Sequence, residues 1–219
     1  MFYRDPLHIY RVTELEAMPW LIHGFGTRFS DIPALVAPLA TLRQVHSAVC
    51  VEAAGRSGVL GEGDALVENT PGRAVAVKTA DCLPILLADA RNRAVAAVHA
   101  GWRGTAAHIV EAAVAAMRDR FGTRAADLDA AIGPGIGPCC YEVGPEVAER
   151  FGREGRTRLD LAAENRRQLE EAGVPRIYLA GLCTMCGPEF HSYRRDRDAA
   201  GRMHAFAGIV ADGRLPAGT

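Results

Sequence analysis

The sequence predicts a single mixed α/β domain in which helices and strands form a layered sandwich. Its 219 residues are 49% hydrophobic and 23% charged, which is ordinary for one globular domain with a substantial core. Short apolar runs of strand character alternate along the chain with segments of helical periodicity. No repeat, low-complexity tract or linker divides residues 1–219, and only the tail from Gly213 is expected to be flexible.

Eight apolar runs predict strands, because they are short and are bounded by Gly, Pro or charged turn residues. In chain order these runs are His8–Thr13, Gln44–Ala53, Arg73–Thr79, Ile85–Asp89, Ala94–His99, Leu128–Ile132, Arg176–Ala180 and Met203–Val210.

Three segments between these runs predict helices. The first is expected over Thr105–Phe121, with Thr105 as its N-cap and Gly122 as its stop. A shorter helix is expected over Pro145–Phe151, because proline suits the first helical position. The third is expected over Asp160–Glu171, with the aspartate as its N-cap.

The charge balance narrows the classes of partner. The chain has 25 basic and 26 acidic residues, a net charge of −1, so it carries no electrostatic footprint for nucleic acid or an anionic membrane. No apolar run is long enough to span a bilayer, and the first residues lack the apolar stretch of a signal peptide. We therefore expect a soluble cytoplasmic protein with reduced cysteines. Composition leaves the oligomeric state open.

A predicted hairpin brings together two side chains that can bind a metal. The segment Asp89–Asn92 has turn character and separates two apolar strands. If the chain folds back between Ala90 and Arg91, Cys82 lies directly opposite His99, with Cβ atoms about 5 Å apart. This separation suits two ligands of one zinc ion, although a one-residue slip in register would turn the side chains to opposite faces.

His46, on another predicted strand, is the best candidate for a third ligand. Two histidines and one cysteine leave the fourth zinc position open, which is typical of a catalytic site. The alternative is structural, because a buried cysteine is often an inert small hydrophobe and a histidine at a strand end is often only hydrogen-bonded.

Basic residues near this group are candidates for anion binding. Arg103 lies in a Gly-flanked turn that leads into the helix start at Thr105, where free N–H groups favour phosphate. A plain strand-to-helix connection is the alternative there. Lys78, the single lysine, immediately precedes the segment that contains Cys82. Arg194 can act as a guanidinium fork for phosphate or substrate, or form a surface ion pair.

The remaining cysteines suggest no second metal site. Cys183 and Cys186 form one CxxC pair, and a structural zinc site needs a second pair. The adjacent Cys139 and Cys140 have poor spacing for this role, so we expect them to pack beside a Gly/Pro turn. Cys50 is expected in a strand interior.

Several longer motifs resemble one protein family, and they occur in the same order. They are Gln44–His46, Thr79–Pro84, His99–Gly104, Ile136–Gly144 and Ser192–Asp196, with smaller matches at Thr27–Arg28, Gly63–Leu66 and Cys183–Thr184. Together they resemble the YfiH family, also called the laccase-domain or multicopper polyphenol oxidoreductase family. The resemblance covers about residues 20–210.

The resemblance implies a single-domain layered α/β/β/α fold of the type grouped with putative cysteine hydrolases. It implies a metal site formed by His46, Cys82 and His99, holding zinc or copper. It also implies phosphorolysis of purine nucleosides (adenosine, inosine, guanosine and methylthioadenosine) with adenosine deaminase activity. Arg28, Lys78, Arg103 and Arg194 are then the candidates for binding substrate and phosphate.

The segment Phe29–Arg43 is shorter than in most members of this family, which bears on substrate preference. Three other functions stay open. They are copper-dependent oxidation of phenols, hydrolysis of a muropeptide precursor with Cys82 as the nucleophile, and zinc binding with weak or absent catalysis.

Overall fold

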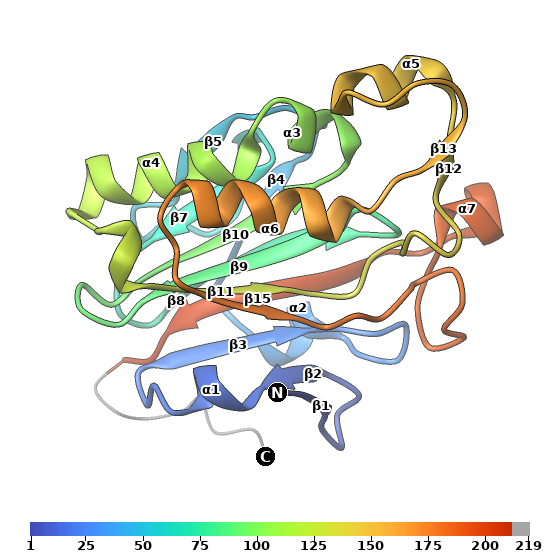
Figure 1. Ribbon diagram of the computed structural model, residues 1–219. Coiled ribbons are helices and arrows are strands. Elements are labelled where there is room, and N and C mark those ends of the chain that lie inside the picture. Colours follow the sequence, from blue (N-terminus) through green and yellow to red (C-terminus); the bar gives the residue numbers. More distant parts are fainter. Residues whose placement is uncertain (212–219) are drawn as a thin grey trace.

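The computed structural model describes residues 1–211 and stacks two β-sheets face to face between helices (Figure 1). The first sheet has the order β1-β2-β3-β15-β8-β4-β6, with strands Phe2–Arg4, Tyr10–Val12, Leu21–Phe25, Met203–Ile209, Arg73–Thr79, Leu39–Arg43 and Gly58–Glu62. The second sheet has the order β14-β11-β9-β10-β7-β5, with strands Arg176–Leu179, Leu128–Ile132, Leu83–Asp89, Ala94–Ala100, Ala65–Glu68 and Cys50–Glu52. A short pair, β12 (Glu142–Val143) and β13 (Thr157–Arg158), stands apart from both sheets.

Helices cover the outer faces of the two sheets. The helices α4 (Ile109–Phe121) and α6 (Leu161–Glu171) lie across the second sheet (Figure 1). On the first sheet the outer layer is thin, with the single turn α2 (Ile32–Leu35) packed on β8 and β15 residues. The other short helices are α1 (Thr13–Glu16), α3 (Trp102–Ala106), α5 (Pro145–Ala148) and α7 (Tyr193–Asp196). The α/β/β/α sandwich implied by the sequence is confirmed.

Alternation along the central strands creates two apolar layers. Leu86 on β9 joins Val75 and Val77 of β8 in the core between the sheets. Its neighbours Ile85 and Leu87 point the other way, into the core beneath α4 and α6. Every residue of β9 and β10 is buried, so the hairpin is packed on both faces. The end of the hairpin near His99 is therefore held in place.

Most predicted elements are present. The runs at Arg73–Thr79 and Leu128–Ile132 match β8 and β11 residue for residue. Asp160 caps α6 by accepting a hydrogen bond from the Ala163 N–H at 3.0 Å. Gly122 ends α4 in a left-handed conformation, as expected.

Three predicted elements are wrong in part. The strand expected over His8–Thr13 forms only as β2, because Thr13 begins α1. Only Cys50–Glu52 of the strand expected over Gln44–Ala53 forms, and residues 44–49 are a loop. The helix expected from Thr105 is divided into α3 and α4 at His108, which has a left-handed backbone. The division is stabilised from α6, because Gln168 donates to the Thr105 carbonyl at 2.9 Å and Asn165 donates to its hydroxyl at 2.9 Å.

The hairpin register also differs from the prediction. His99 pairs with Pro84 and Ala94 with Asp89, so Cys82 lies beyond the start of β9 and not directly opposite His99. The difference amounts to two residues and therefore keeps both side chains on the same face. Within residues 1–211, no helix has the length and hydrophobicity needed to cross a bilayer. The tail expected from Gly213 lies outside the described residues.

Candidate active site

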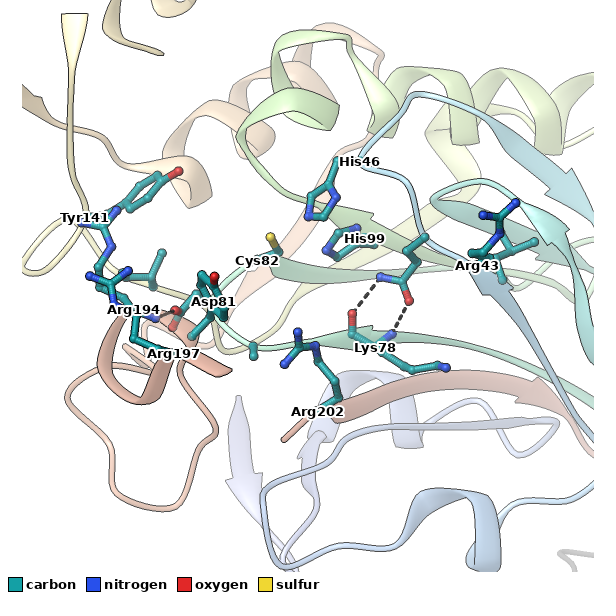
Figure 2. A pocket seen from close by; sticks show the side chains of 15 residues that line it. Arg43, His46, Lys78, Asp81, Cys82, His99, Tyr141, Arg194, Arg197 and Arg202 are labelled. Atoms are coloured by element: carbon teal, nitrogen blue, oxygen red, sulfur yellow. Dashed lines mark hydrogen bonds between the residues drawn. The ribbon is translucent and has the colours of Figure 1, made fainter. Parts of the chain in front are cut away.

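Three side chains from separate elements meet at one end of the sandwich. His46 lies in the loop after β4, Cys82 in the bend between β8 and β9, and His99 near the end of β10 (Figure 2). One ligand atom of each lies within 4.8 Å of the others. The two imidazole rings meet edge to face, with centroids 5.0 Å apart. Two ring nitrogens and a sulfur at these separations form a donor set suited to one zinc ion.

A fully buried carboxylate, Asp64, orients two of these ligands. Its Oδ1 accepts the N–H of His46 at 3.0 Å and faces Nδ1 of His99 at 2.9 Å. Its Oδ2 accepts from the N–H and hydroxyl of Ser47 at 2.6 and 2.7 Å. The loop is therefore wrapped around Asp64, which sets the left-handed backbone of His46. A carboxylate behind a histidine also fixes its tautomer and leaves Nε2 free as a ligand.

Electrostatics favour a thiolate at Cys82 in the metal-free protein. Burial raises the pKa of this thiol, but hydrogen bonds with His46 and His99 outweigh burial and lower the pKa to about 6. Burial lowers the pKa of His99, whereas its bonds to Asp64 and Cys82 raise the pKa to about 9. Burial raises the pKa of Asp64, but its hydrogen bonds with His99 and Ser47 outweigh burial and hold the pKa well below its usual range. The group thus carries a thiolate next to an imidazolium at neutral pH.

A glycine makes room for the sulfur. A Cβ atom at Gly101 would lie 2.8 Å from Cys82 Sγ and 3.3 Å from His46 Cδ2. Any side chain at this position would displace two of the three candidate ligands. The Gly101 position after His99 is therefore part of the site.

The three ligands lie in a cavity of about 770 Å³. This volume suits a nucleoside-sized ligand. Its wall is rich in basic and aromatic side chains (Figure 2), and the lining residues are Leu42, Arg43, Gln44, His46, Lys78, Ala80, Asp81, Cys82, His99, Ile136, Tyr141, Tyr193, Arg194, Arg197 and Arg202.

The cavity favours an anion. Five of its lining residues are Lys or Arg, whereas Asp81 is the acidic one. The Asp81 carboxylate is already engaged, by the Thr184 hydroxyl at 2.7 Å and the Arg194 N–H at 2.6 Å. Arg194 lies over the Tyr141 ring at 5.3 Å, and its guanidinium donates to a backbone carbonyl. Arg43 forms an ion pair with Glu62, and the charge of the other four cations exceeds the acidic charge available to neutralise it.

Comparisons with known proteins identify the family of this chain. A family model described as "Multi-copper polyphenol oxidoreductase laccase" matches residues 28–210. The chain belongs to this family, the YfiH family. A protein of Deinococcus radiodurans named "Purine nucleoside phosphorylase" is 44% identical over 180 residues, covering 78% of this chain and 70% of that protein. The Escherichia coli "Purine nucleoside phosphorylase YfiH" is 37% identical over 182 residues, covering 77% and 73%.

A solved structure of the YfiH family has the same fold. The crystal structure of YlmD from Geobacillus stearothermophilus superposes with a TM-score of 0.84 at 30% identity, covering 95% of this chain and 98% of that one.

The predicted anion-binding residues separate into two groups in this YfiH-family chain. Lys78 and Arg194 line the cavity. Arg103 is exposed and stacks over the Trp102 ring at 4.3 Å, outside the set of lining residues. Arg28 is also exposed and outside that set, and it donates to the Pro188 carbonyl at 3.3 Å.

Sequence reasoning missed other site residues. Asp64 was visible only as part of the short family match Gly63–Leu66. Gln44 forms a pair of hydrogen bonds with the Lys78 backbone, both at 2.8 Å, and so joins the His46 loop to β8 (Figure 2). The segment Phe29–Arg43, expected to be shorter than in most of the family, contains α2 and β4, and its last two residues line the cavity directly.

Proposed function

We propose that this protein is a zinc-dependent purine nucleoside phosphorylase with a secondary adenosine deaminase activity. The observation that carries the proposal is the combination of one His/Cys ligand group with a basic, aromatic cavity of nucleoside size. The names of the relatives from Deinococcus radiodurans and Escherichia coli support the same substrate class. The proposed substrates are adenosine, inosine, guanosine and methylthioadenosine, with phosphate as co-substrate.

The donor set fits zinc. His46, Cys82 and His99 would hold the ion, and the Asp64–His99 hydrogen bond supplies the supporting carboxylate found behind zinc-bound histidines. Zinc held there would supply a Lewis acid that makes a water molecule more acidic. Copper can bind the same donors, but multi-electron reduction of oxygen needs further copper sites. Within residues 1–211, the other group of metal-binding side chains consists of four cysteines.

The basic residues of the cavity have a role in phosphorolysis. The bond between ribose and purine breaks while a phosphate oxygen attacks the ribose carbon, so phosphate must be held beside the sugar. We assign this role to Lys78 and Arg194, which line the cavity. Tyr193 lines the same wall and offers an aromatic face to the purine, as does the face of Tyr141 that Arg194 does not cover.

The test is chromatography of purified, metal-analysed protein incubated with adenosine or inosine, with and without phosphate. We expect free base only when phosphate is present, and inosine from adenosine. Cys82→Ala should abolish turnover with the fold intact, and Lys78→Ala should raise the KM for phosphate. An exposed-surface change, Arg118→Ala, serves as the control. Full activity in Cys82→Ala would exclude this site.

A second candidate function is amide hydrolysis with Cys82 as the nucleophile. The low pKa of this thiol beside His99 favours it, because a thiolate–imidazolium pair is an activated nucleophile. This function requires Cys82 to be free of metal. Chelation should then raise activity on a muropeptide precursor, whereas it should abolish phosphorolysis of nucleosides.

A further inference from the structure

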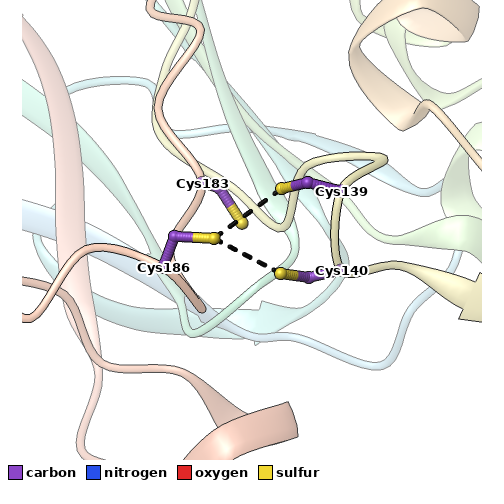
Figure 3. A group of neighbouring side chains, drawn as sticks. All are labelled: Cys139, Cys140, Cys183 and Cys186. Carbon is purple, nitrogen blue, oxygen red and sulfur yellow. Dashed lines mark hydrogen bonds between the residues drawn. The ribbon is translucent and has the colours of Figure 1, made fainter.

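Four cysteines from two distant segments meet beside the cavity. Cys139 and Cys140 follow β11, whereas Cys183 and Cys186 follow β14 (Figure 3). Their sulfur atoms all lie within 4.8 Å of one another. This cysteine cluster is separate from the His46–Cys82–His99 group. The adjacent Cys139 and Cys140 have poor spacing for a metal site on their own, but here they form a group of four with the CxxC pair of another loop.

Backbone hydrogen bonds hold the two segments together. Gly135 forms a parallel bridge with Cys183, and its carbonyl accepts the Thr184 N–H at 3.0 Å. The Gly187 N–H donates to the Cys183 carbonyl at 2.9 Å, which closes the CxxC turn. The cluster is therefore assembled by the fold, and its geometry is preorganised.

The distances between sulfurs suit a tetrahedral ion. Four thiolates around zinc, with Zn–S bonds of about 2.3 Å, place neighbouring sulfurs about 3.8 Å apart. Cys186 Sγ lies 3.7 Å from Cys139 Sγ and 3.4 Å from Cys140 Sγ. The four cysteines form no disulfide in this structure, so each sulfur can act as a ligand. The Gly137 N–H also donates to Cys183 Sγ at 3.3 Å, as backbone amides do around metal-bound thiolates.

We propose that Cys139, Cys140, Cys183 and Cys186 bind a structural zinc ion. Four thiolates fill the tetrahedral coordination sphere and leave no position for water or substrate. The ion would join two segments of the cavity wall. Tyr141 follows Cys140 directly and lines the cavity, and Thr184 within the CxxC turn holds Asp81 next to Cys82.

The first test isolates the cluster from the candidate active site. In a Cys82→Ser protein, elemental analysis should find one zinc per chain, and cobalt loading should give the intense absorption of a tetrathiolate complex. The pair Cys82→Ser/Cys183→Ser should lose both signals. Cys50→Ser in the same background is the matched control, because Cys50 lies in β5, outside both groups. An unchanged zinc content in Cys82→Ser/Cys183→Ser overturns the proposal.

A second measurement does not depend on the folding of a cluster variant. In the zinc-loaded Cys82→Ser protein, a thiol reagent should reach four more sulfurs after chelation than before. Intact-mass analysis of protein purified without reductant is carried out alongside the thiol count, to detect any disulfides. Equal thiol counts before and after chelation overturn the proposal. A decrease in intact mass that shows disulfides within the cluster, in protein that contains no zinc, also overturns the proposal. Neither result bears on nucleoside phosphorolysis.

Discussion

Replacement of Asp64 by asparagine should weaken metal binding more than any other change behind the ligands. The carboxylate accepts hydrogen bonds from the backbone of Val45, His46 and Ser47, from the Ser47 hydroxyl and from His99. An amide keeps one acceptor oxygen and turns an NH₂ group toward the other donors. Whichever way the amide is oriented, at least two donors lose their acceptor.

The magnitude follows from these contacts. A hydrogen bond to a charged group contributes about 1.5–3 kcal/mol, so two lost bonds should lower the free energy of unfolding of the metal-free protein by roughly 3–6 kcal/mol. Loss of the carboxylate behind a zinc-bound histidine lowers zinc affinity about 10- to 100-fold. That change corresponds to about 1.4–2.7 kcal/mol of binding free energy. Asp64→Asn should therefore reduce both stability and affinity.

Competition with a chromophoric chelator measures zinc affinity in a Cys183→Ser background, which removes the proposed second zinc site at the cysteine cluster, and urea denaturation measures stability. Asp129→Asn is the matched control, because Asp129 is also buried and accepts bonds from Arg176 and Tyr178 at 2.8 and 3.0 Å, away from the site. We expect it to lose stability while keeping its zinc affinity. An Asp64→Asn protein that binds zinc as tightly as the native protein would refute the role assigned to this carboxylate.

Three further predictions test the site and the fold. Gly101→Ala should abolish zinc binding at the His46–Cys82–His99 group, because its Cβ would lie 2.8 Å from Cys82 Sγ; isothermal titration of this variant with zinc checks this. In metal-free protein at neutral pH, iodoacetamide should modify Cys82 (pKa about 6) before Cys50, whose pKa burial raises to about 12, and zinc should protect Cys82; peptide mass mapping measures both sites, and equal rates would contradict the assignment. Burial lowers the pKa of His23 to about 3, so its contribution to stability is complete above pH 6.5 and falls toward pH 3 by up to about 1.4 kcal/mol per pH unit, since the unfolded state binds the proton first. Urea denaturation of His23→Gln across this range should show a smaller pH dependence than the native protein.

The strands at the centre of the fold could be predicted from the sequence. Those with continuous apolar character, such as β8 and β11, are bounded by clear turn residues and were found at their observed limits. Shorter strands were missed, including β7 (Ala65–Glu68), because four residues give too little periodicity to distinguish a strand from a loop. The break at His108 was also missed, because it depends on contacts from α6 that are distant in sequence.

The candidate ligands were named together although the register used to find them was wrong. The predicted hairpin has Cys82 opposite His99, whereas Pro84 occupies that position in the structure. Side chains alternate with a period of two residues, so a difference of two residues leaves both side chains on the same face of the hairpin. A difference of one would have removed Cys82 from the group. The alternation of side chains along the strands therefore predicts the pairing of Cys82 with His99 more reliably than the assumed position of the turn does.

The residues that sequence reasoning missed are those whose role exists only in the folded protein. Asp64 becomes a supporting carboxylate because the chain from β4 to β5 bends around it. Cys139 and Cys140 become neighbours of Cys186 because β11 and β14 run parallel and their exits lie side by side. Both parallel strands end at the same edge of the second sheet, so the loops that follow them must share space there. The cysteine cluster and the cavity wall are thus consequences of one topological feature, and the Thr184–Asp81 bond connects the cluster to Cys82 at 2.7 Å.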